Sequence, residues 1–369
     1  MPPGLNFSAP AYVCPEVVRM KTRLRGILQA ALLAGWAAFL LLRPQRAAQA
    51  VAEGLALCAG AVLPALFPFF VCTGMLNALG LTQRFANAVC AAPARLLGVS
   101  RDGAAVWAAG LLGGYPAGAQ GAAEGYREGR LSAAEAAHLA RIANNAGPGF
   151  VFSMAGAGIF GSPGAGLALW LCQLMSAVLL GIFLRRSAPR PQCAAAKQAD
   201  AKPLPFSAAL TRAVKNAGSV SLSVCMMVVT FRVLCGALDT ILPTETPTAL
   251  RIILSGVLEL SGGTALLAHA ALPRVGAFAL CSFLLAFGGV GVAAQVASVM
   301  QDAGLRVHGY LRAKLLQGTL AAILSLPAGL FLFSDRQDAA RLTALYAAAG
   351  TICIIFRKVM TGNLRAKRV

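Results

Sequence analysis

Long apolar runs constrain this sequence more than any other feature. An α-helix needs about 20 predominantly apolar residues to cross the hydrocarbon core of a bilayer. Several stretches approach that length, the clearest being 26–42, 164–184, 220–238, 252–271 and 315–333. Only 12% of the 369 residues are charged, about half the ~25% that is usual in soluble domains. The sequence therefore predicts an all-α polytopic membrane protein, located in the cell membrane as a multi-pass chain with the lipid bilayer as a partner.

The formal net charge of +19 is typical of nucleic-acid binding in a soluble protein. Here the lysines and arginines lie between apolar runs, as the positive-inside rule requires, and no basic stripe with interleaved aromatic residues occurs. We therefore expect no nucleic-acid partner. The densest basic segment, 185–215, is predicted to be a cytoplasmic linker. A homo-oligomer is left open.

The two ends of the chain are also basic. Residues 1–25 are expected to form a disordered, basic N-terminus, with either Met1 or Met20 as the start. Residues 26–46 resemble a signal peptide, but the apolar run is long and is followed by arginines, so they are predicted to be the first transmembrane helix. Residues 334–369 are expected to form a C-terminal helix and a basic tail.

The remaining composition argues against catalysis. The ten cysteines are scattered singly without a CxxC pair, and His138, His269 and His308 lie far apart in the sequence. A disulfide framework, a metal site and a bound cofactor are therefore not expected. Neither a P-loop nor an HExxH motif is present, so the chain is not expected to be an enzyme.

Two apolar segments are interrupted in the same way. Gly113-Gly-Tyr-Pro-Ala-Gly-Ala-Gln120 aligns without a gap to Gly288-Gly-Val-Gly-Val-Ala-Ala-Gln295, at an offset of 175 (288 − 113 and 295 − 120). Gly113, Gly114 and Pro116, and likewise Gly288 and Gly289, predict helix breaks or re-entrant hairpins. We interpret residues 47–184 and 216–333 as two transporter-like repeats. Paired interruptions of this kind indicate a transporter's binding site, because free backbone groups at membrane depth are tolerated only around a cavity or inside the protein.

Glu259 is the strongest candidate for function. If a helix begins near Thr248, eleven residues at about 1.5 Å each place Glu259 about 16 Å deep, near the middle of a bilayer. A charge there usually faces a cavity or a partner, which favours ion coupling or substrate binding. The alternative is a structural carboxylate that is protonated or paired with a basic group. Ser261 lies close enough in sequence to add a hydroxyl ligand.

Five further polar residues are candidates for substrate binding. Asn144 and Asn145 follow a capping box at Ser132 and either contact a polar substrate or satisfy the helix break at Gly147-Pro148. Gln120 and Gln295 lie just past the two interruptions and either bind substrate or stabilise the hairpins. Lys314, with Arg312 and Arg141, either attracts an anion or extends to the interface.

Several motifs resemble the YlbJ (SpoVV) family of sporulation integral membrane proteins, which carry the nucleoside recognition or Gate domain. The motifs are Pro64-Ala-Leu-Phe-Pro-Phe-Phe70, Gly114-Tyr-Pro-Ala-Gly-Ala-Gln120, Asn144-Asn-Ala-Gly-Pro148, Phe160-Gly-Ser-Pro163 and Leu258-Glu-Leu-Ser-Gly262. They extend over roughly 57–333. The family commonly follows its glutamate with a hydroxyl residue and then an amide, whereas here Gly262 takes the place of the amide.

The resemblance implies a function as well as a fold. It implies two hairpin-containing Gate-like repeats and the movement of dipicolinic acid, a small organic anion, across the outer forespore membrane during endospore formation. The first expectation is thus a transporter of a small anionic substrate. Alternatives are a nucleoside or metal-ion transporter of the Gate-domain type, and a sporulation membrane scaffold that transports nothing.

Overall fold

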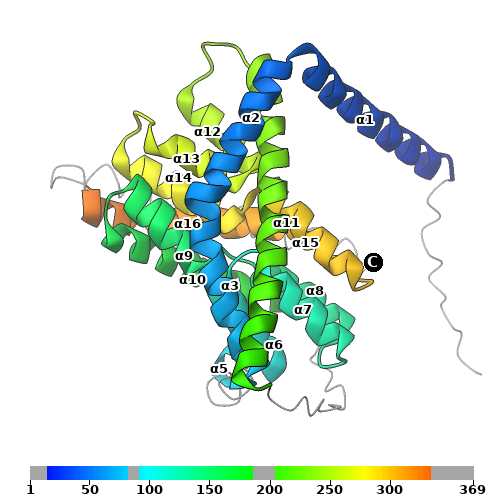
Figure 1. Ribbon diagram of the computed structural model, residues 1–369, viewed down its shortest axis with the longest axis vertical. Coiled ribbons are helices and arrows are strands. Elements are labelled where there is room, and N and C mark those ends of the chain that lie inside the picture. The colour runs from blue at the N-terminus through cyan, green and yellow to red at the C-terminus, as the bar shows by residue number, and fades with distance from the viewer. Residues whose placement is uncertain (1–14, 82–90, 186–203, 334–369) are drawn as a thin grey trace, which may run out of the picture.

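The computed structural model describes residues 15–81, 91–185 and 204–333, and every regular element within these ranges is helical (Figure 1). Five helical stretches there are long and apolar enough to cross a membrane. The prediction of an all-α polytopic membrane protein is therefore confirmed. The expectations for residues 1–14, for the centre of the basic linker and for the C-terminal helix and tail fall outside the described residues.

Two long helical columns form an antiparallel pair (Figure 1). One consists of α2 (Pro44–Leu57), the π-helical turn η1 (Cys58–Val62) and α3 (Leu63–Ala78), and the other is α11 (Phe206–Ile241). Two glycines let the columns approach closely. A Cβ atom on Gly54 would lie 3.0 Å from the Cα of Val229, and one on Gly74 would lie 3.2 Å from the Cβ of Ala213. Small residues at such crossings are typical of helix packing in membranes.

Two helix boundaries differ from those expected from the sequence. The first transmembrane helix was expected at 26–46, whereas α1 (Pro15–Leu42) ends before Pro44 and α2 begins there. Proline lacks the N–H that would continue a helix and suits the first helical turn, which explains this boundary. α11 begins at Phe206, inside the segment 185–215 that was expected to be a linker.

The first half of the chain continues with interrupted helices. A short helix, α5 (Ala91–Leu97), precedes α6 (Arg101–Gly113), which folds back onto α7 (Ala117–Arg127). Between them Gly114 has a φ of +81° and the Tyr115–Pro116 peptide bond is cis. Next, α8 (Ala133–Ile142) stops before α9 (Pro148–Phe150) and the π-helical η2 (Val151–Ile159), and α10 (Pro163–Leu184) is uninterrupted.

The second half has a similar order of elements. α12 (Thr248–Leu258) and α13 (Leu260–Ala268) are separated by Glu259 alone, and α14 (Arg274–Phe287) meets α15 (Gly289–Asp302) at Gly288. α16 (Tyr310–Phe333) is continuous and packs against α10 and α14.

The internal duplication stays a prediction. By order along the chain, each half has a long column, two interrupted helices and one continuous helix. By this order, the α14–α15 break in the second half corresponds to the α8–α9 break in the first half. By the sequence offset of 175, the α14–α15 break corresponds instead to the α6–α7 break. The two correspondences differ, so the repeat boundaries 47–184 and 216–333 also stay predictions.

Candidate functional site

A cavity lies where four helix breaks face the α3–α11 pair. Its volume is about 50 Å³. The wall is largely apolar, and its polar side chains belong to Tyr115, Glu259, Ser261 and Gln295. The α8–α9 break contributes Ala146 and Gly147 to the same wall. We call this space the Glu259 cavity.

Glu259 is held at the break between α12 and α13. Its backbone is extended, with a φ of −142° and a ψ of 120°, and its carboxylate accepts hydrogen bonds from the N–H groups of Ser261 (2.8 Å) and Gly262 (2.5 Å). The side chain thus caps the N-terminus of α13, where free N–H groups and the helix dipole favour a negative charge. Glu259 is 5% exposed.

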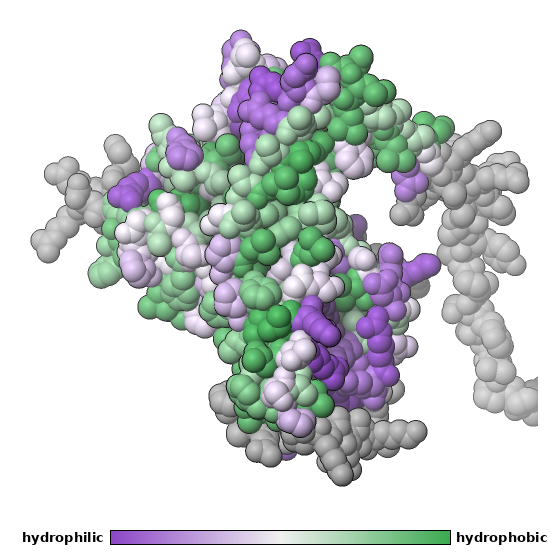
Figure 2. Space-filling view, in the orientation of Figure 1, coloured by the Kyte–Doolittle hydropathy of each residue, from purple (hydrophilic) through white to green (hydrophobic). Residues whose placement is uncertain are grey.

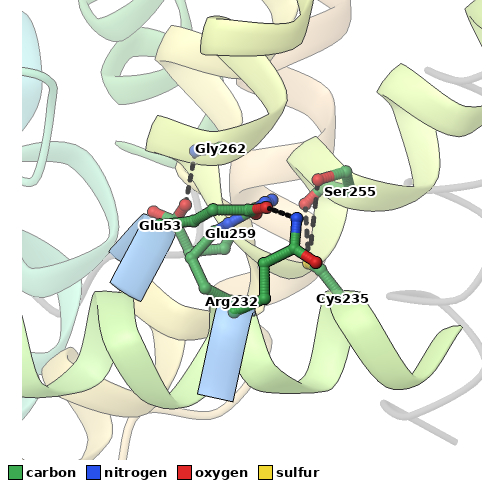
Figure 3. Close-up of polar contacts among 7 residues, drawn as sticks. Glu53, Arg232, Cys235, Ser255, Glu259 and Gly262 are labelled. Atoms are coloured by element: carbon green, nitrogen blue, oxygen red, sulfur yellow. Dashed lines mark hydrogen bonds and ion pairs between the residues drawn. The ribbon is translucent and has the colours of Figure 1, made fainter. Parts of the chain in front are cut away.

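An arginine absent from the predicted site lies beside this carboxylate (Figure 3). Arg232 on α11 forms an ion pair of 2.6 Å with Glu53 on α2. A Cβ atom on Gly262 would lie 2.8 Å from Nη1 of Arg232 and 3.1 Å from Oε2 of Glu259. The guanidinium therefore occupies the space that a side chain at position 262 would need. The one sequence signal for Arg232, a charged residue inside the apolar run 220–238, was not used in the prediction from the sequence.

A second polar cluster surrounds Lys314 on α16. The Lys314 ammonium donates to the Asn144 carbonyl (2.5 Å) and to Oε1 of Gln317 (2.6 Å), and Nε2 of Gln317 donates to Oδ1 of Asn145 (2.6 Å). All four residues are fully buried. Among the described residues Lys314 forms no ion pair with a carboxylate. Gln317 was not among the residues predicted from the sequence, although it lies one helical turn from Lys314 on the same face of α16.

The two asparagines also satisfy the helix break itself. Oδ1 of Asn144 accepts from the backbone N–H of Ala119 (2.9 Å), and its Nδ2 donates to the Ala140 carbonyl (2.7 Å). Nδ2 of Asn145 donates to the Ile142 carbonyl (3.1 Å). Unpaired polar groups at this depth are costly, so these bonds fix the break between α8 and α9.

Tyr115 separates Lys314 from the Glu259 cavity. Its ring lines the cavity, and the Lys314 ammonium lies 5.4 Å from the ring centroid. The Tyr115 hydroxyl lies 3.2 and 3.3 Å from the carbonyl oxygens of Leu285 and Ala286, to which it donates. Tyr115 belongs to a motif that the sequence singled out, but it was not among the candidate residues.

The structure thus brings together only some of the sequence candidates. Glu259, Ser261 and Gln295 line one cavity, and Oε1 of Gln295 is buried without a hydrogen-bond partner among the residues that the structure describes. Asn144, Asn145 and Lys314 form the cluster behind Tyr115. Gln120 lines a different cavity between α3, α6, α7 and α11. The glutamines aligned in sequence therefore lie in separate places.

The helices, their breaks and the buried polar groups define an all-α, multi-pass integral membrane protein with a polar interior site. The chain is similar to the sporulation integral membrane protein YlbJ of Bacillus subtilis (strain 168), with 27% identity over 314 residues, 76% of this chain and 77% of that protein. The resemblance indicated by the sequence motifs is therefore confirmed. No family model matches the chain. No solved structure matches it either.

Proposed function

We propose that the protein is a carrier that moves a small organic anion across the membrane, with Glu259 as the group that couples transport to protons. The cargo proposed first is dipicolinic acid during endospore formation, and the location is the outer forespore membrane. Cargo and location are what the resemblance of the sequence motifs implies, and the name of the similar protein supports a role in sporulation. The class of activity comes from the site.

The observation that carries the proposal is the position of Glu259. Its carboxylate is buried at a helix break, and its side chain lines a cavity formed at three other breaks. Ionisable groups inside membrane proteins are costly and usually mark substrate or ion pathways. Broken helices around such a group are typical of secondary transporters, in which freed backbone groups and side chains bind cargo.

Lys314 supports an anionic cargo. Its hydrogen-bond partners are uncharged, so a protonated Lys314 carries a charge that no partner neutralises. The ammonium lies behind the ring of Tyr115, which lines the cavity, and opposite charges attract more strongly at such a buried site than in water.

Glu259 would repel the same anion when ionised. A proton on Glu259 removes that repulsion, so proton and anion binding favour each other, which is the linkage that a proton-coupled carrier requires. Transport should therefore be fastest when an inward proton gradient accompanies the anion.

Uptake of labelled dipicolinate into proteoliposomes tests the proposal. We expect the wild-type protein to respond to the proton gradient and Glu259→Gln to transport at a rate that no longer changes with pH. Glu245→Gln, in the exposed turn after α11, is the matched control and should behave as the wild type. An unchanged rate and pH profile in Glu259→Gln would remove the coupling role. Wild-type protein that moves no anion would overturn the transport proposal.

Spore chemistry provides a test in cells. If the cargo is dipicolinate, spores of a strain that lacks the gene should contain little of it, and the gene in trans should restore it. Normal dipicolinate content in such spores would exclude this cargo.

A nucleoside is the second candidate cargo, because the unpaired Oε1 of Gln295 can accept a hydrogen bond from a base. Competition for uptake by nucleosides, divalent metal ions and dicarboxylates separates these cargoes. A protein that moves none of them would favour the scaffold alternative.

A further inference from the structure

We infer that a second, polar cavity on the α3–α11 pair is the aqueous entrance to the Glu259 cavity. This vestibule is bounded by α3, α6, α7 and α11, and its polar wall includes Thr73, Gln120, Glu124, Arg130 and Asn216. Its volume is about 310 Å³. Figure 2 shows hydrophilic side chains gathered at a hollow beside the lower part of α11, next to α7 and α8. The inference rests on the proposed transport function and gives it a route.

The vestibule and the Glu259 cavity are separated by one helical turn. On α3, Leu66 lines the Glu259 cavity and Phe70 lines the vestibule. On α11, Val224 lines the cavity and Val220 lines the vestibule. Residues four apart on a helix lie on the same face, and four residues rise about 6 Å. Each column therefore lines both spaces with the same face of its helix.

The α6–α7 break closes the other side of this passage. Tyr115 lines the Glu259 cavity, whereas Ala117, at the first position of α7, lines the vestibule. The layer between the two spaces includes the apolar side chains of Leu66, Phe70 and Val224, all of which are buried. A thin apolar layer between two cavities is a constriction that blocks water while closed. A movement of the α6–α7 hairpin against α3 would open it.

The vestibule opens at the end of the molecule that carries the basic segment. It includes Asn77 and Gly80 at the end of α3 and Asn216 near the beginning of α11. The backbone N–H of Leu204 donates to the Ala78 carbonyl (3.2 Å), which places the start of the second half beside the end of the first column. Arg212 and Lys215 lie on the same part of α11. By the positive-inside rule this is the cytoplasmic face.

The lining suits a small hydrophilic solute with its water. Gln120 and Asn216 offer neutral donors and acceptors, and Arg130 is already paired with Glu128 through Nε (2.6 Å). Among the described residues, the lining therefore has no unpaired cation that would hold an anion in the vestibule. This gives Gln120 a place on the route, separate from the site that Gln295 lines.

Cysteine accessibility in the full-length protein tests the inference. Val220→Cys lies at the inner end of the vestibule, and Leu222→Cys, on the same helix, replaces a side chain that is 60% exposed outside it. The thiolate, which forms in water and not in hydrocarbon, attacks the methanethiosulfonate sulfur, forms a mixed disulfide and displaces methanesulfinate. A charged, membrane-impermeant methanethiosulfonate applied to the cytoplasmic face should modify Val220→Cys at least about tenfold faster than Leu222→Cys. Peptide mass mapping distinguishes these sites from the natural cysteines.

Uptake after modification provides the second readout. Bulky modification of Val220→Cys should slow anion uptake at least about tenfold, whereas the same treatment should leave Leu222→Cys unaffected. A wild-type protein that transports while Val220→Cys stays unreactive, or stays active once modified, overturns the entrance. If Val220→Cys reacts but the wild type moves no anion, the water-filled vestibule is supported and the proposed transport function is overturned.

Discussion

At the scale of single residues, Lys314 is the buried basic group on which the proposed anion specificity depends. Its charge is surrounded by a carbonyl, an amide and the face of Tyr115. We expect Lys314→Met, which keeps most of the side-chain length but removes the charge, to reduce anion uptake by about tenfold or more, because the electrostatic attraction between the ammonium and the anion is lost. Initial rates over a range of anion concentrations measure this effect.

The control for this variant lies on the same helix. Arg312 is exposed at the beginning of α16, and Arg312→Met should change uptake little, since exposed charges are screened by solvent and salt. Lys314→Met also leaves Oε1 of Gln317 without its donor, which costs about 1–3 kcal/mol of stability. The thermal midpoint should therefore fall in Lys314→Met alone. Equal uptake in the two variants would contradict a role of Lys314 in anion attraction.

At the scale of elements, the α12–α13 break depends on a close approach of two glycines. A Cβ atom on Gly263 would lie 2.1 Å from the Cα of Gly256, so Gly263→Ala forces the two helices apart. We expect a loss of about 1–3 kcal/mol in the free energy of unfolding, as is usual for overpacking. The thermal midpoint in detergent, followed by intrinsic fluorescence, is the measurement.

Gly218→Ala on α11 is the matched control, because a Cβ atom there would meet nothing within 4 Å. Alanine is favoured over glycine in a helix by about 0.8–1.0 kcal/mol, so this variant should raise the midpoint slightly. A Gly263→Ala protein as stable as Gly218→Ala would show that the break tolerates separation of α12 and α13.

The same break shows where sequence reasoning ends. Apolar runs predicted the membrane helices because burial in lipid requires them. Paired glycines indicated the helix breaks because only glycine readily adopts a positive φ, as at Gly114 and Gly288. The pair Gly262-Gly263 follows Glu259, but neither glycine has a positive φ and both lie inside α13, so the pair does not mark this break. There the carboxylate itself replaces the missing helical contacts by accepting from two N–H groups.

Other parts of the site depended on packing between distant segments. The pairing of Asn144 and Asn145 with Lys314 and Gln317 joins residues about 170 positions apart. The similar spacing of Gln120 and Gln295 indicated equivalent positions, but the helices that surround each one differ, so their side chains line different cavities. The sequence indicated which polar residues are candidates for the site, but only the fold shows which of them contact one another.

At the scale of the whole molecule, α11 gives the vestibule and the Glu259 cavity a common direction across the membrane. The helix has 36 residues and is about 54 Å long, which exceeds the ~30 Å hydrocarbon core. Both of its ends should therefore emerge into water. Arg212 and Lys215 near its beginning place that end in the cytoplasm by the positive-inside rule, and the turn after Ile241 should lie on the opposite face.

Two exposed positions report this orientation. Ser207 lies at the beginning of α11, and Thr244 lies in the turn after its end. We expect an impermeant thiol reagent to modify Thr244→Cys in intact, non-sporulating cells that produce the protein in their cell membrane. Ser207→Cys should react only after permeabilisation, with the unsubstituted protein measured in parallel to subtract the natural cysteines. Modification of both from the same side would show that α11 does not cross the bilayer once. The reverse pattern would place the vestibule on the outer face, where cargo would enter the Glu259 cavity from outside the cytoplasm.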